Sequence, residues 1–129
     1  MGQELVKAYQ ELKVYRLAFE TAMELYWLLP QMLLEEDSLG KQLIEASRSA
    51  TTLLAEAWES RQYYRTFVAK LNEVEMRIAM VQTWLAFAVE CGYLEGDVVQ
   101  MYSKRYGTIV EEISGLIEAA TDWSLRTVA

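Results

Sequence analysis

The residues that could do chemistry in this chain are carboxylates, serines and a single cysteine. The sequence contains no histidine, so it lacks the base of Ser–His–Asp and Cys–His nucleophile systems and a common ligand of zinc and haem. The serines of residues 46–50 therefore have no activating partner, and adjacent carboxylates such as Glu111 and Glu112 point in different directions from a helix. We expect Cys91 to be a small buried residue. These patterns predict no enzyme activity, no catalytic residue, no bound metal and no cofactor.

Four basic residues in the middle third of the chain are candidate contacts for nucleic acid. They are Arg61, Arg65, Lys70 and Arg77. Glu73 and Glu75 lie among them in sequence, which favours a salt-bridged surface. The formal net charge of the chain is −7, and a negative protein is repelled by phosphate backbones and anionic membranes. We therefore expect neither nucleic acid nor a membrane as partner, and the four residues carry the alternative, nucleic-acid-binding hypothesis.

The negative charge is unevenly distributed along the sequence. Residues 1–37 carry three basic and seven acidic side chains, and residues 78–129 carry the same numbers. Residues 38–77 carry six basic and five acidic side chains, a net +1. Any basic surface is therefore expected in this middle third.

The elements that must position these side chains are predicted to be four helices. Apolar residues recur at alternating steps of four and three between Phe67 and Ala88, the spacing of one buried stripe on a helix. Three other segments carry a similar stripe. We predict an all-α, antiparallel up-and-down four-helix bundle that forms one domain over residues 1–129. Its helices are expected over about residues 9–29, 38–59, 62–91 and 97–121.

Local signals place the helix ends. Pro30 disfavours helical geometry in the preceding residue, so we expect it to end the first helix. Residues 33–38 are predicted to be a connection with a solvated acidic run rather than a metal site. Asp37 or Ser38 is the expected cap of the second helix.

The second and third helices are predicted to separate near Ser60, a possible cap, although a continuous bent helix is the alternative. Gly92 is well placed to end the third helix in a left-handed conformation. Gly107 and Gly115 should destabilise the fourth helix, each by roughly 1 kcal/mol relative to alanine. We interpret Gly115 as a position of close packing.

The composition also predicts self-association in the cytoplasm. The hydrophobic fraction is 53%, slightly above the usual range, and the first and third helices each carry a second apolar stripe. The candidate residues of an oligomer or partner interface are Val14, Ala18, Leu25, Met80, Trp84 and Phe87. No apolar run reaches the length of a membrane span, and no secretory signal precedes the first helix.

Short motifs in all four predicted helices are similar to those of one known family. They are Leu12-Lys13-Val14-Tyr15, Ala18, Leu25-Tyr26, Leu39, Gln42-Leu43, Ala46, Ser49, Ala55-Glu56, Phe67, Leu71, Gly92-Tyr93-Leu94 and Gly115-Leu116-Ile117. Over about residues 9–120 the chain resembles the four-helix-bundle proteins encoded by intervening sequences within bacterial 23S ribosomal RNA genes. The resemblance implies an up-and-down bundle, often a ring-shaped homopentamer, without known catalysis.

The chain is also similar to the accessory proteins of diversity-generating retroelements, which are basic and bind nucleic acid and reverse transcriptase. It departs from the family pattern at Ile44 and Glu45, where basic residues are usual, and at Leu53, Ala57 and Met80. Our leading hypothesis is therefore a non-enzymatic, oligomeric assembly or adaptor protein that binds another protein. The alternative is a nucleic-acid-binding accessory protein like these relatives.

Overall fold

A computed structural model describes residues 8–35 and 37–120, and all of their regular elements are helical. They are the 3-10 helix η1 (Tyr9–Glu11) and the α-helices α2 (Lys13–Leu28), α3 (Gln31–Glu35), α4 (Ser38–Glu59), α5 (Tyr64–Glu90) and α6 (Gly96–Glu118). Four of these helices are long, and they correspond to the four predicted from the stripes. The all-α prediction is confirmed.

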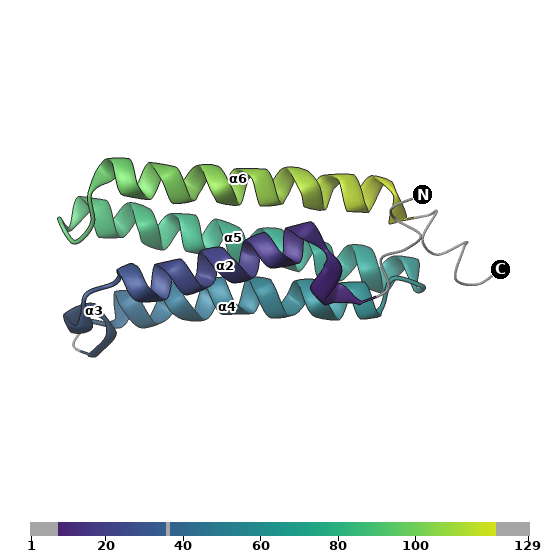
Figure 1. Cartoon of the computed structure of the whole chain (residues 1–129), viewed down its shortest axis with the longest axis horizontal. Coiled ribbons are helices and arrows are strands. Elements are labelled where there is room, and N and C mark those ends of the chain that lie inside the picture. Colours follow the sequence, from purple (N-terminus) through teal and green to yellow (C-terminus); the bar gives the residue numbers. More distant parts are fainter. Residues whose placement is uncertain (1–7, 36, 121–129) are drawn as a thin grey trace.

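The four long helices lie side by side, and the chain reverses direction between them (Figure 1). Helix α4 packs against α2 and α5, and α6 packs against the same two helices. Within the described part of the chain α4 does not approach α6. The two helices α4 and α6 therefore occupy opposite sides of the molecule, an arrangement compatible with the predicted antiparallel bundle.

The core stripe predicted on the third long helix is buried as expected. Its members are Phe67, Leu71, Val74, Ile78, Val81, Leu85 and Ala88, and none is more than 1% exposed. Trp58 of α4 meets the ring of Phe67 edge-on, with 6.4 Å between the ring centroids. Burial of such a continuous stripe is the main stabilising contribution to a helix of this kind.

The first helix and the connection after it differ from the prediction. Leu12 has an extended backbone and a buried side chain, which separates η1 from α2. Helix α2 ends just before Leu29, as Pro30 predicts. The expected connection contains the short helix α3, which packs on α4. Gly40 permits this packing, because a Cβ atom there would overlap the carbonyl of Leu33.

The ends of α4 are set by two side chains. The carboxylate of Asp37 accepts a hydrogen bond from the Leu39 N–H at 2.9 Å and caps the start of the helix, as predicted. Ser60 is the C-terminal cap residue, and its hydroxyl donates to the carbonyl oxygen of Glu56 at 2.7 Å. The alternative of one continuous bent helix is therefore wrong.

The end of α5 follows the predicted glycine signal. Gly92 has φ +76°, and the Tyr93 N–H donates to the Ala88 carbonyl oxygen at 2.8 Å. The Gly92 N–H donates to the Val89 carbonyl oxygen at 2.9 Å, which completes a Schellman motif. Cys91 is the cap residue here and is exposed, so its predicted burial is wrong.

Two glycines of α6 are not explained by packing inside the chain. Among the described residues no neighbouring atom lies within 4 Å of the position of a Cβ atom at Gly107 or Gly115. The interpretation of Gly115 as a site of close packing is therefore wrong within this chain.

Candidate functional site

Half of the predicted interface lies in the core of the chain itself. Val14, Ala18 and Leu25 are at most 3% exposed and belong to the core cluster between the helices. These side chains already pack inside one chain, so they are not available at its surface. The structure therefore corrects their assignment to an intermolecular interface.

Two aromatic residues of α2, Phe19 and Tyr26, lie at the surface and were not among the predicted interface residues. Phe19 and Tyr26 are seven residues apart, so they lie on the same side of the helix, and both are exposed. The guanidinium of Arg48 from α4 lies over the Tyr26 ring, 5.3 Å from its centroid. This contact shows that the aromatic side of α2 borders the outer surface of α4.

The α5 candidates lie at the surface, as a continuous apolar stripe. Phe87 is 51% exposed and Met76 is 60% exposed, while Met80 is exposed and Trp84 is partly buried. The rings of Trp84 and Phe87 are 5.7 Å apart between centroids. We call Met76, Met80, Trp84 and Phe87 the α5 stripe.

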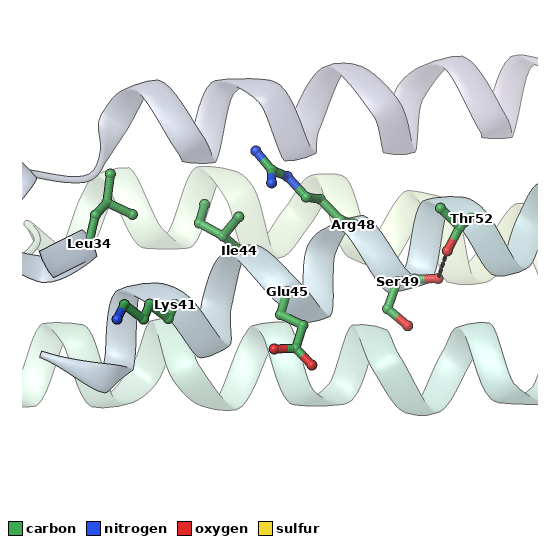
Figure 2. A pocket seen from close by; sticks show the side chains of 7 residues that line it. All are labelled: Leu34, Lys41, Ile44, Glu45, Arg48, Ser49 and Thr52. Atoms are coloured by element: carbon green, nitrogen blue, oxygen red, sulfur yellow. Dashed lines mark hydrogen bonds between the residues drawn. The ribbon is translucent and has the colours of Figure 1, made fainter.

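Three adjoining hollows cover the outer side of α4 and its border with α5. The first has a volume of about 500 Å³ (Figure 2) and is lined by Leu34, Lys41, Ile44, Glu45, Arg48, Ser49 and Thr52. The second is lined by Gln42, Glu45, Ala46, Ser49, Arg77 and Met80. The third is lined by Glu73, Met76, Arg77 and Met80. Shared residues join the three hollows into one surface.

We call this surface, with the α5 stripe and the aromatic side of α2, the α4 face. Its centre is recessed, because the side chains of α4 are short at Ala46 and Ser49. Its two margins are raised by large apolar side chains from α2 and α5. A recessed surface with apolar margins of this kind is typical of a site for another protein segment.

The charges of the α4 face are mainly unneutralised cations. Among the described residues no salt bridge involves Lys41, Arg48 or Arg77. Figure 2 shows Arg48 pointing toward α2, whereas Glu45 points away from it. The face therefore presents separated positive groups, although the whole chain is acidic.

The four candidate nucleic-acid contacts do not form one free cationic cluster. Lys70 makes a salt bridge with Glu56, with 3.1 Å between Nζ and Oε1. The guanidinium of Arg61 stacks over the Trp58 ring at 4.5 Å and donates to the Trp58 carbonyl oxygen. Arg77 lies at the α4 face, and Arg65 is exposed near the start of α5. Two of the four cations are therefore engaged by neighbours on α4.

A polar network on the opposite half of the molecule joins α2 to α6. Arg105 donates to the carboxylate of Glu24 at 2.7 Å, and the Tyr102 hydroxyl donates to the same carboxylate at 3.2 Å. The hydrogen bond from Arg105 lowers the pKa of Glu24. Burial, followed by the Glu24 charge, raises the pKa of Tyr102. These groups pair with one another and therefore serve the fold.

The described residues contain no group of three or more metal-ligating side chains that could hold a metal ion. In the same part of the chain no helix is long and apolar enough to cross a membrane. The arrangement of side chains thus points to the α4 face as the candidate site, through shape and apolar surface rather than reactive groups.

Comparison with protein-family models identifies a match. The family model described as 23S rRNA-intervening sequence protein matches residues 10–115, well over half of the chain. No curated protein matches it, and no solved structure matches it.

Proposed function

The chain belongs to the family of 23S rRNA-intervening sequence proteins, and we propose that it is a non-enzymatic assembly or adaptor protein. In this proposal copies of the antiparallel four-helix bundle associate with one another and present a surface to another protein. The observation that carries the proposal is the α4 face, with its exposed aromatic and methionine side chains. No reactive constellation competes with it among the described residues.

The amount and grouping of apolar side chains support an interface. Phe19, Tyr26, Met76, Met80 and Phe87 are all exposed, and they line the two margins of the same face. Grouped apolar side chains of this size are uncommon on the surface of a monomer and mark association sites. Aromatic residues and methionine are also the types enriched at protein interfaces.

The proposed number of copies is five. This number rests on the resemblance to a family whose members often form ring-shaped homopentamers, and the α4 face supplies a surface through which copies would meet. With a chain mass of 14.9 kDa, a pentamer has a mass of about 75 kDa.

Light scattering after gel filtration tests the proposal with matched variants. Met80→Glu, with Phe87→Glu as a second variant, places a charge on the α5 stripe and is expected to shift the protein toward the monomer. Trp27→Glu is the control, because Trp27 is 69% exposed on α2 and lines none of the three hollows, whereas Met80 is 38% exposed on α5. Assembly that persists in both α5 variants would remove the α5 stripe from the proposal.

The alternative function is nucleic-acid binding, and the observation that favours it is the absence of salt bridges to Arg65 and Arg77 among the described residues. Against it stands the net charge of −7 per chain, which an oligomer multiplies. We expect no specific binding of structured RNA or duplex DNA at about 150 mM salt in fluorescence anisotropy. Submicromolar, salt-sensitive binding that disappears in Arg65→Glu would favour the alternative.

A further inference from the structure

The α4 face carries a surplus of positive charge on a strongly acidic chain. Three cations, Lys41, Arg48 and Arg77, lie among only two exposed carboxylates, Glu45 and Glu73. No salt bridge neutralises these cations in the described part of the chain. A partner for this face should therefore bring carboxylates.

The opposite side of the molecule has complementary features on the outer surface of α6. Asp97, Lys104, Glu111 and Glu118 are exposed there, so carboxylates outnumber cations. Gly107 and Gly115 lie on the same side, and both leave open space where a side chain would be. This outer surface is therefore acidic, and its backbone is accessible to close approach.

We propose that the α4 face binds the outer surface of α6 from a second copy of the chain. This inference deepens the proposed function and rests on it, because it names the partner of the α4 face. Successive copies then associate head to tail, with the basic side of one chain against the acidic side of the next.

The spacing of charges on the two surfaces matches. Lys41 and Arg48 are seven residues apart on α4, and Glu111 and Glu118 are seven residues apart on α6. Each pair spans about 10.5 Å along its helix axis, so both cations meet a carboxylate in a single helix-to-helix contact.

The shapes of the two surfaces also fit. The short side chain of Ser49 lies at the centre of the α4 face. A glycine four residues away lies on either side of Glu111 on α6, at 107 and 115. Small residues on both helices permit their backbones to approach closely, while the apolar margins of the α4 face enclose the contact.

A symmetric contact between two α4 faces is less favourable. It would bring the cations of one copy toward the same cations of the other, and like charges at an interface are repulsive. A contact between two different surfaces is heterologous, and it closes into a ring when the rotation between copies permits. The positions of α4 and α6 on opposite sides of the bundle provide the two surfaces.

Charge exchange tests the pairing. The α4 variant carries Lys41→Glu with Arg48→Glu, and the α6 variant carries Glu111→Lys with Glu118→Lys. All four positions are exposed, so the fold should be retained, which circular dichroism checks. The combined variant carries all four changes and restores the wild-type net charge of −7. Arg65→Glu, at an exposed position near the start of α5 that lines none of the three hollows, is the control for a charge change elsewhere.

Sedimentation velocity over a concentration series gives the dissociation constant of each form. We expect the α4 variant and the α6 variant each to dissociate at roughly tenfold higher concentration than the wild type, and the combined variant to recover. A wild type that stays monomeric would overturn the proposed function and this pairing together. A wild type that assembles, with a combined variant no better than the α4 variant, would overturn the pairing alone.

Discussion

Alanine at both Gly107 and Gly115 of α6 is predicted to stabilise the folded chain and weaken its assembly. Gly107 lies in the interior of the helix, where alanine is favoured by about 1 kcal/mol. Gly115 lies near the C-terminal end at Glu118, so its gain should be smaller, about 0.5 kcal/mol. No described neighbour lies within 4 Å of either added methyl group, so no steric cost offsets the gain inside one chain.

The two effects are separated by measuring them in different backgrounds. Urea unfolding in the Met80→Glu background reports on the dissociated chain, and we expect Gly107→Ala with Gly115→Ala to raise its free energy of unfolding by about 1.5 kcal/mol. In the otherwise wild-type chain the same methyl groups would lie in the proposed contact with the α4 face. They should separate the two backbones and shift dissociation to higher concentration.

A matched control is available at the start of the same helix. Gly96 also has open space around its absent Cβ, but it is the first residue of α6. Gly96→Ala should therefore change stability little and leave assembly unaltered. If the double alanine variant is more stable yet assembles as well as the wild type, the reasoning that connects these glycines to close approach is refuted.

Three further predictions concern the fold. Tyr106→Phe should raise the free energy of unfolding by about 1 kcal/mol in urea titrations, because the buried Tyr106 hydroxyl has no hydrogen-bond partner among the described residues; a clear loss of stability would mean that the hydroxyl is bonded. Ile78→Asp should destabilise by roughly 3–5 kcal/mol, since it places an unpaired charge in the core, and a thermal melt like that of the parent would contradict this. The lowered pKa of Glu24 implies that its contribution is present above the ordinary carboxyl pKa of 4.5 and is lost as pH falls through the lower folded value. Because the pair with Arg105 is partly exposed, this contribution should stay below about 1 kcal/mol. Thermal melts at several pH values should show this pH-dependent stabilisation in the parent and not in Glu24→Gln.

Much of the fold could be predicted because its signals are local or periodic. Apolar residues recur without interruption at steps of three and four from Phe67 to Ala88, and this periodicity identified the buried face of α5 beside its second, exposed stripe. Pro30, Asp37 and Gly92 act through backbone geometry and hydrogen bonds within a few residues. Such signals need no knowledge of which helices become neighbours.

The orientation of α2 could not be predicted in the same way. Both of its adjacent stripes are apolar, and periodicity shows which residues share a side but not which side faces the core. Val14 and Leu25 take the interior, whereas Phe19 and Tyr26 stay at the surface. The need for a glycine at position 40 is equally hidden, because it arises from the approach of the α3 backbone to α4.

The candidate site, like the fold, could be predicted only in part from the sequence. The surface position of Met80 and Phe87 followed from their place beside the core stripe. The union of α2, α4 and α5 into one face depends on tertiary packing, as does the pairing of Lys70 with Glu56 across two helices. Sequence alone therefore located part of the α4 face and favoured a salt-bridged surface in the middle third, but it did not identify Glu56 as the partner of Lys70.

The central claim is that copies of this chain assemble through the α4 face. The most direct test is the solution mass of the unmodified protein by light scattering, measured at micromolar concentrations. Assembly predicts a multiple of 14.9 kDa, with about 75 kDa for the pentamer. A single species of 14.9 kDa that does not change with concentration would contradict the account.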